Sequence, residues 1–117
     1  MYRLTLLLTL VATGAAGGEV DQSAALTALQ RADSVLIDVR TEREYAEGSL
    51  PGSVRIETRD LPQRIASVAP DKDAPIVLYC RSGSRSSAAQ DLLHGLGYSQ
   101  VINAGGYEDL RAVVPSR

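Results

Sequence analysis

The only cysteine of the chain, Cys80, occupies a position that favours reactivity. It ends an apolar run over residues 76–79 and precedes a turn rich in serine, glycine and arginine. A helical pattern follows through Ala88 and beyond. A cysteine before a helix N-terminus meets backbone N–H groups and positive potential, and both favour the thiolate over the thiol. The sequence therefore predicts an activated cysteine nucleophile.

The chain has one cysteine and one histidine, and this restricts the alternatives. A free cysteine is often only a small buried apolar residue, but the polar and cationic residues after Cys80 are poor core neighbours. His94 stands near the end of the following helix, which favours a dipole partner over a catalytic base. One cysteine and one histidine cannot complete a metal site, so neither a metal nor another cofactor is expected.

Length and charge limit the class of protein. A chain of 117 residues is typical of one domain with a single core. The core must be built from aliphatic residues, because the chain has five tyrosines but no tryptophan or phenylalanine. The net charge of −2 argues against nucleic-acid binding, which requires a basic face.

Residues 1–18 differ from the rest of the chain. A basic start at Arg3 is followed by an apolar run over residues 4–12 and then by small residues, as is typical of a secretory signal peptide. The run is about half of the roughly 20 residues that span a bilayer, so no stable membrane insertion is expected. The hypothesis is a signal peptide over 1–18 and a soluble periplasmic or secreted domain over 19–117. A buried N-terminal helix or strand of a cytosolic protein is the alternative.

Strands and helices alternate along the remaining residues. Apolar runs predict strands at residues 35–39, 54–56, 76–79 and 101–102. Helical patterns and caps predict helices at residues 21–31, 42–46 (capped by Thr41), 61–68, 88–94 and 107–113. Continuous apolar strands separated by helices predict an α/β fold, with a mostly parallel central sheet and helices on both faces. Such a sheet brings two strand ends, Asp38 and Cys80, to the same edge.

Four stretches together resemble a known family, in the family's order. They are Leu36-Ile37-Asp38-Val39-Arg40 with Glu44, Tyr45 and Gly48; Leu50-Pro51-Gly52-Ser53 with Ile56; Cys80-Arg81-Ser82-Gly83-Ser84-Arg85-Ser86, of the form C-x-x-G-x-R-S; and Asn103-Ala104-Gly105-Gly106-Tyr107. The chain resembles the single-domain rhodaneses, thiosulfate sulfurtransferases, and among them the exported phage shock protein E group. The resemblance covers about residues 20–112 and implies a rhodanese-like domain over 19–117. Ser49 and Tyr107 depart from the family's common histidine and tryptophan, which affects local packing.

The resemblance implies that Cys80 accepts the sulfane sulfur of thiosulfate as a persulfide. A small-molecule thiol in the cell, or cyanide in vitro, then removes it. The implied substrate-binding residues are Arg81, Ser82, Gly83, Ser84, Arg85 and Ser86. Backbone N–H groups of this loop would cradle the sulfur, and Arg81 or Arg85 would hold the sulfonate. Arg85 is expected to turn inward and Arg81 to be more exposed.

Asp38 and Arg40 are expected to support the site without reacting. An acid that ends a buried strand usually accepts backbone N–H bonds or pairs with an arginine. Arg40 and Glu44 are four residues apart, which predicts a local ion pair that braces the loop.

Two other functions remain open. Cysteine-loop phosphatases and arsenate reductases carry C-x5-R, whereas Arg85 is five places after Cys80, and the shorter loop favours a single sulfur over a tetrahedral oxyanion. Rhodanese-like domains also serve as non-enzymatic binding modules or as persulfide carriers that supply a protein acceptor. Retention of Cys80 favours sulfur transfer but does not separate an enzyme from a carrier.

Overall fold

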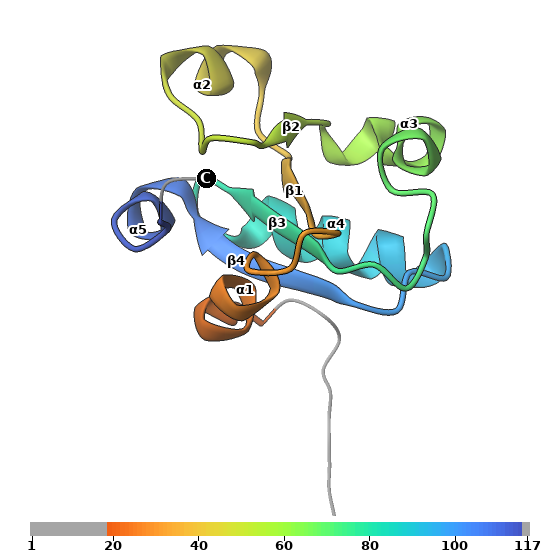
Figure 1. The fold of residues 1–117 in the computed structure, drawn as a ribbon. Coiled ribbons are helices and arrows are strands. Elements are labelled where there is room, and N and C mark those ends of the chain that lie inside the picture. Colours follow the sequence, from red (N-terminus) through yellow and green to blue (C-terminus); the bar gives the residue numbers. More distant parts are fainter. Residues whose placement is uncertain (1–18, 116–117) are drawn as a thin grey trace, which may run out of the picture.

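The fold of residues 19–115 is described by a computed structural model (Figure 1). The predicted signal peptide over residues 1–18 lies outside the described residues.

A four-stranded parallel sheet forms the centre of the molecule. Its strands are β1 (Val35–Asp38), β2 (Val54–Arg55), β3 (Ile76–Cys80) and β4 (Val101–Gly106). They lie in the order β2-β1-β3-β4, and every pair is parallel. The predicted α/β fold is confirmed, and its two longest apolar runs, β1 and β3, pair directly with each other.

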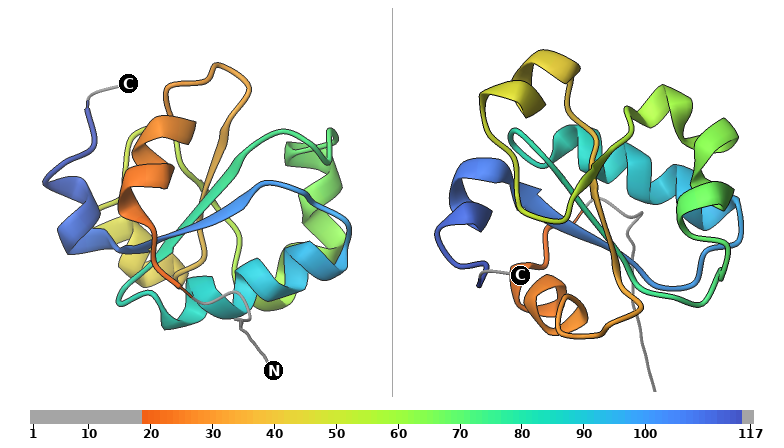
Figure 2. Two further views of the ribbon diagram at one scale, coloured as in Figure 1. Left: turned by 90° about the horizontal axis from the view of Figure 1, so that it is seen from below. Right: turned by 45° about the horizontal axis from the view of Figure 1, so that its top comes forward.

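Five α-helices and a short 3₁₀ turn connect the strands in the described part of the chain. They are α1 (Gln22–Ala28), α2 (Glu42–Glu47), η2 (Thr58–Asp60), α3 (Leu61–Val68), α4 (Ser84–Gly95) and α5 (Tyr107–Arg111). Figure 2 shows α1 on one side of β3 and β4 and α4 on the other. None of the helices among residues 19–115 is long and apolar enough to cross a membrane.

The alternation of side chains along β3 divides the core between the two faces of the sheet. Leu78 and Cys80 belong to the cluster beneath α3 and α4, whereas Val77 and Tyr79 pack with α1 and α5. All five β3 residues are buried, as expected for a central parallel strand covered on both sides. The strand therefore places Cys80 on the α4 face, at the carboxyl end of the sheet.

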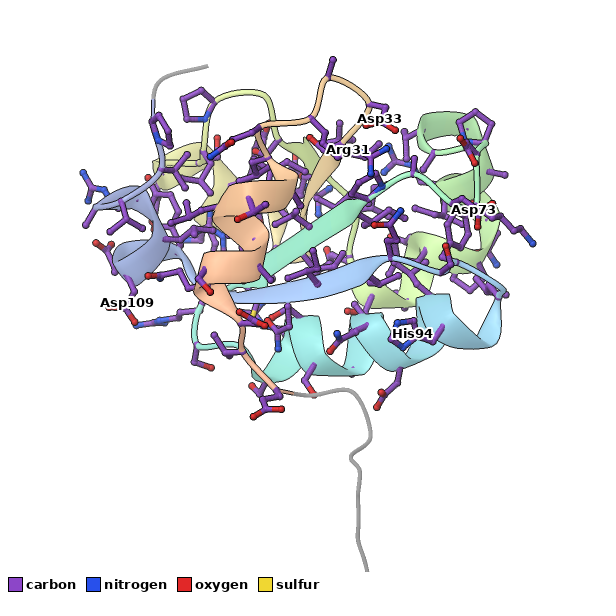
Figure 3. All side chains as sticks on the ribbon, turned by 60° about the horizontal axis from the view of Figure 1, so that its bottom comes forward. Arg31, Asp33, Asp73, His94 and Asp109 are labelled. Atoms are coloured by element: carbon purple, nitrogen blue, oxygen red, sulfur yellow. The ribbon has the colours of Figure 1, made fainter. Side chains whose placement is uncertain are left out.

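Two predicted helices are shorter in the structure. The first ends at Ala28, because the next N–H groups bond three residues back: Gln30 donates to the Thr27 carbonyl and Arg31 to the Ala28 carbonyl. Arg31 itself pairs with Asp33 at 2.8 Å, beyond the helix (Figure 3). The last helix, predicted to reach residue 113, ends at Arg111.

The largest difference from the sequence prediction follows Cys80. The polar segment read as a long loop contains only three loop residues, Arg81, Ser82 and Gly83, because α4 begins at Ser84. Gly83 adopts the left-handed φ of 103° that turns the chain into this helix. Arg85 and Ser86 therefore lie in the first turn of α4, where backbone N–H groups have no partner within the helix.

Candidate active site

Cys80 lies between the end of β3 and the first turn of α4, and its side chain is fully buried. The N–H of Gly83 donates to its Sγ at 2.9 Å. The Oγ of Ser86 lies 3.4 Å from the same sulfur. A short loop and a helix start thus enclose the sulfur with hydrogen-bond donors.

These donors lower the pKa of Cys80. Burial alone would raise it, because a charged sulfur loses hydration. The Ser86 hydroxyl and the backbone N–H groups of Ser86, Gly83 and Ser82 outweigh that cost, so the pKa falls below its ordinary value. The direction agrees with the thiolate predicted from the sequence.

The two arginines of the loop have different environments. Arg85 forms a bidentate ion pair with Glu44 of α2, at 2.8 and 2.9 Å. It was expected to turn inward to the loop, and its guanidinium instead bridges α4 and α2, although Cys80 still contributes to its raised pKa after the dominant bond to Glu44. Arg81 is exposed and makes no ion pair within residues 19–115.

The predicted ion pair between Arg40 and Glu44 is wrong. Arg40 pairs with Asp38 through Nε and through a terminal nitrogen at 2.8 Å, and its own backbone N–H donates to Asp38 Oδ1. Both side chains are almost completely buried. Arg40 pairs with Asp38 because this buried carboxylate lies only two residues away, and Glu44 pairs with Arg85 instead. Asp38 has both of the partners expected for an acid at the end of a buried strand, a backbone N–H and an arginine, while its supporting role stays a prediction.

Arg40 also connects two loops at the carboxyl end of the sheet. It donates to the Gly48 carbonyl at 2.6 Å. Its guanidinium lies 4.4 Å from the ring centroid of Tyr107 and 5.4 Å from that of Tyr79. A cation within this distance of two neighbouring aromatic rings is stabilised by both, so Arg40 connects the end of β1 to α5 and to the turn after α2.

Glu44 carries out two structural tasks. It completes a capping box with Thr41, whose Oγ1 accepts from the Glu44 N–H while Glu44 Oε1 accepts from the Thr41 N–H at 2.9 Å. Its bond to Arg85, assisted by these contacts, lowers the pKa of Glu44 to about 2 despite the opposing effect of burial. The cap of α2 and the first turn of α4 therefore share one carboxylate.

The remaining serines of the loop divide between surface and core. Ser82 and Ser84 are exposed, with their hydroxyl oxygens 3.4 Å apart. Ser86, which the sequence suggested as a substrate contact, is fully buried beneath Cys80. Its hydroxyl also reaches Asn103 Oδ1 at 2.6 Å. Asn103 was missed as a site residue, although it belongs to the fourth stretch of the family pattern.

A cavity of about 260 Å³ opens beside the loop. Its lining comes from three loops and the start of α5, and comprises Arg40, Glu44, Glu47, Gly48, Arg81, Tyr107 and Glu108. Arg40 and Glu44 already hold buried or partly buried partners of opposite charge. Arg81 is consequently the cation of this lining that is available to an anion.

His94 lies in the last turn of α4, which it was predicted to occupy (Figure 3). At 1.5 Å per residue it is about 15 Å along the helix from Ser84, too far to act as a base for Cys80. Among residues 19–115, no three His, Cys, Asp or Glu side chains are grouped so as to hold a metal ion.

Comparison with known proteins shows which proteins the chain is similar to. The family model described as a rhodanese-like domain matches residues 21–112. The thiosulfate sulfurtransferase PspE of Escherichia coli is 36% identical over 74 residues, which cover 63% of this chain and 71% of that protein.

Solved structures show the same fold. A rhodanese with anions from E. coli is 34% identical, with a TM-score of 0.66 over 70% of this chain and 94% of that one. A Rhodopseudomonas palustris protein of unknown function, described as a possible tyrosine phosphatase, is 28% identical, with a TM-score of 0.68 over 81% of this chain and 79% of that one.

Proposed function

The chain belongs to the rhodanese-like sulfurtransferase family, and on that premise we propose that it transfers the sulfane sulfur of thiosulfate through a persulfide on Cys80. The observation that carries this proposal is the buried Cys80 sulfur, whose pKa is lowered by hydrogen bonds from Ser86, Gly83 and Ser82 against the cost of burial. The same donors would stabilise the negative outer sulfur of a persulfide.

Two displacements complete the reaction. The Cys80 thiolate attacks the terminal sulfur of thiosulfate, and the S–S bond of thiosulfate breaks with its electron pair leaving on sulfite. An acceptor thiolate, or cyanide, then attacks the outer sulfur of the persulfide. The Cys80 S–S bond breaks, and the thiolate of Cys80 returns.

Arg81 is the residue that we assign to the sulfonate of the donor. Its guanidinium is exposed beside the cavity and has no carboxylate partner within the described chain. Arg85 is already paired bidentately with Glu44, and a substrate that recruited it would have to break that pair. A free guanidinium near a departing sulfite favours both binding and departure.

Phosphate chemistry is less compatible with this loop. Only Arg81, Ser82 and Gly83 separate Cys80 from α4, and the sulfur lies fully buried beneath them. A terminal sulfur atom is narrower than a tetrahedral phosphate and reaches such a site more easily. Hydrolysis of an aryl phosphate that disappears in Cys80→Ser would contradict this preference.

The function is tested by incubating the purified protein with thiosulfate. The intact mass of the wild type should increase by one sulfur atom, and addition of cyanide should release thiocyanate and restore the original mass. Cys80→Ser should do neither, whereas Ser67→Ala, which changes an exposed hydroxyl on α3, should behave as the wild type. A wild-type protein that gains no sulfur would refute the proposal.

Whether the protein is an enzyme or a persulfide carrier depends on the acceptor. A carrier hands its sulfur to a partner protein much faster than to cyanide or to a small thiol. Single-turnover rates of the persulfide form with each acceptor distinguish the two roles.

We also propose export, on the strength of residues 1–18. Mass spectrometry of the mature protein should find a chain that begins near Glu19. A mature protein that retains Met1 would contradict export and leave the chemistry of Cys80 unaffected.

A further inference from the structure

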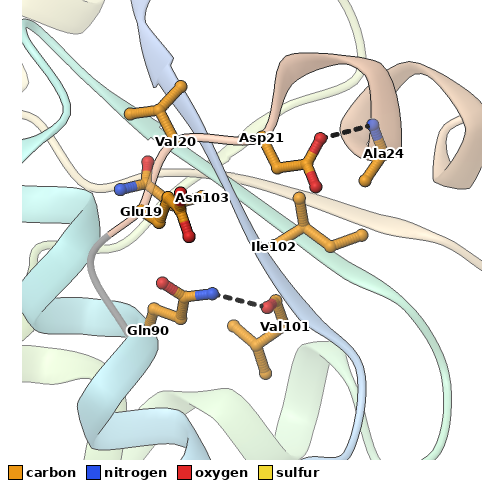
Figure 4. Close-up of a pocket in the computed structure, with 8 residues that line it drawn as sticks. All are labelled: Glu19, Val20, Asp21, Ala24, Gln90, Val101, Ile102 and Asn103. Atoms are coloured by element: carbon orange, nitrogen blue, oxygen red, sulfur yellow. Dashed lines mark hydrogen bonds between the residues drawn. The ribbon is translucent and has the colours of Figure 1, made fainter. Parts of the chain in front are cut away.

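Asn103 lies on the same face of the sheet as Cys80, behind the catalytic loop. It pairs in register with Leu78, so both side chains point toward α4. The register then shifts, because Cys80 pairs with Gly106 and β4 carries one residue more than β3 between these points. Figure 4 shows Asn103 on β4 beside Val20 and opposite Gln90 of α4. Its side chain is fully buried.

The amide of Asn103 has a fixed orientation. Its Oδ1 accepts from the Gly105 N–H at 3.0 Å and from the Ser86 hydroxyl at 2.6 Å. Its Nδ2 donates to the Gly83 carbonyl at 3.0 Å. A flipped amide would place an acceptor against the Gly83 carbonyl and a donor against the Gly105 N–H, so the two backbone groups determine which atom faces Ser86.

Both partners of Asn103 in the loop contact the reactive sulfur. Gly83 donates its N–H to Cys80 Sγ at 2.9 Å, and its carbonyl is the group that Asn103 holds. The Ser86 hydroxyl lies 3.4 Å from Cys80 Sγ. That hydroxyl has one proton and three possible acceptors, namely Asn103 Oδ1 at 2.6 Å, the Gly83 carbonyl at 3.1 Å and the sulfur, so it cannot donate to Asn103 and to the sulfur at once.

The arrangement forms a short relay around the sulfur. In the thiol form, Cys80 donates its S–H to Ser86, and Ser86 donates to Asn103. When Cys80 loses its proton, the Ser86 hydrogen turns toward the sulfur only by leaving Asn103 Oδ1, so Asn103 opposes this one bond, while its amide nitrogen keeps the Gly83 carbonyl in place. The Gly83 N–H and the Ser86 hydroxyl then both donate to the Cys80 thiolate, and the nitrogen and oxygen atoms of these donors keep their positions.

We propose that Asn103 is a positioning residue of the site: it binds the carbonyl of Gly83, the residue whose N–H donates to Cys80 Sγ, and it fixes the position of the Ser86 oxygen. It touches neither sulfur nor substrate. The inference rests on the proposed sulfur transfer for its role in function, but its test requires no sulfur donor.

The charged groups of the loop and of the elements packed around it are unchanged in every variant used below, and Arg85 is the one that interacts electrostatically with Cys80. They are Arg85 on α4, Arg81 in the loop, the Asp38–Arg40 pair at the end of β1, and Glu44 on α2. A change in the ionisation of Cys80 is then due to its hydrogen bonds.

The test is a pH titration of the Cys80 thiolate by its ultraviolet absorbance, with the matching Cys80→Ser variant subtracted. Because Cys80 is the only cysteine, the signal belongs to one group, and no reagent has to reach a buried sulfur. In Asn103→Leu the Gly83 carbonyl loses its partner and the Gly83 N–H is no longer held on the sulfur, so the midpoint should rise by up to about one pH unit, the size of one weakened hydrogen bond to a charged group. A folded Asn103→Leu protein that titrates as the wild type would overturn the proposal.

Two further variants keep the test decisive. Asn103→Ser leaves a polar group in the same space and should shift the midpoint in the same direction by less, even if Asn103→Leu fails to fold. Tyr98→Phe loses a buried hydrogen bond of 2.7 Å to the Ala69 carbonyl, away from the loop, and should titrate as the wild type. An equal shift in Tyr98→Phe would mean that general loosening moves the midpoint, and would overturn the proposal.

The route through Ser86 is tested by a double-mutant cycle. If Asn103 acts partly by placing the Ser86 hydroxyl, the shifts of Asn103→Leu and Ser86→Ala should sum to more than the shift of the double variant. Additive shifts would overturn this route. A protein that accepts no sulfur from thiosulfate but shows these shifts would refute the proposed function alone.

Discussion

At the scale of single residues, the two loop arginines have separated roles. Arg85 is held by Glu44 through two hydrogen bonds, whereas Arg81 is exposed beside the cavity and unpaired within the described chain. The sequence predicted that Arg81 is the more exposed of the two, but it predicted that Arg85 turns inward and did not indicate its partner, because Glu44 comes from another helix.

Replacing Arg81 by alanine should therefore weaken binding of thiosulfate without changing the nucleophile. We expect KM for thiosulfate to rise about fivefold to tenfold, corresponding to about 1 kcal/mol for one exposed ion pair, with a small change in kcat. Steady-state thiocyanate formation measures both constants. Arg59→Ala, which removes another exposed arginine that lies on η2, should leave them unchanged. An unchanged KM in Arg81→Ala would remove Arg81 from the sulfonate site.

The glycine that ends the catalytic loop provides a second residue-scale prediction. Gly83 has a φ of 103°, and a Cβ there would lie 3.1 Å from Val20 Cγ2. Gly83→Ala should cost about 1–2 kcal/mol, since left-handed backbone disfavours a side chain by that amount. It should also raise the pKa of Cys80 by displacing the N–H on its sulfur.

Gly95 provides the matched control. It ends α4, its φ is not in the left-handed region, and a Cβ there meets nothing within 4 Å. Gly95→Ala should raise the stability by up to about 1 kcal/mol, because alanine is the better helix former. Urea denaturation of both variants measures the difference, and a Gly83→Ala protein as stable as Gly95→Ala would contradict the strain at residue 83.

At the scale of elements, one ion pair couples α2 to α4. Glu44 caps α2 and holds Arg85 in the first turn of α4, and the bond to Arg85 is the main reason that the pKa of Glu44 falls to about 2. A carboxylate with a lowered pKa contributes stability above its unfolded pKa, near 4.3, and loses that contribution as the pH falls toward 2.

Glu44→Gln should accordingly lower the free energy of unfolding by about 1 kcal/mol at neutral pH, with the partial exposure of the pair reducing its strength. The difference from the wild type should shrink between about pH 4.5 and pH 2. Urea titrations across this range measure it, and Glu47→Gln, on the same helix but exposed, serves as control. A difference that does not depend on pH would show that the lost contact is not electrostatic.

At the scale of the whole molecule, a segment before α1 supports the back of the active site. Val20 forms a parallel bridge with Asn103, and Asp21 donates its N–H to the Asn103 carbonyl at 2.8 Å. The Val20 side chain lies against Gly83 and Gly105. Residues distant in sequence therefore meet behind Cys80.

Removing this segment should loosen the loop. A chain that begins at Gln22 should be about 2 kcal/mol less stable than one that begins at Glu19, since it lacks the Asp21 cap of α1 and the backbone bond to β4. Its Cys80 thiolate should titrate at higher pH. Equal stability and equal titration of the two chains would show that the segment does not support the site.

The sequence by itself determined the α/β class, the strand end that carries Cys80 and the loop spacing that identifies the family. These follow from local information: apolar runs, caps, and residues adjacent in the chain. It also indicated that Asp38 would find a backbone N–H or an arginine as its partner.

Only the tertiary structure decided which groups share the site. Glu44 bonds Arg85 instead of Arg40, and Asn103 of β4 reaches Gly83 and Ser86, although 20 and 17 residues, respectively, separate it from them. Helical spacing identifies neighbours within one helix, whereas these contacts depend on the order of parallel strands and on a shift in register. The start of α4 at Ser84 was also missed, because serine and arginine fit a loop as well as a first helical turn.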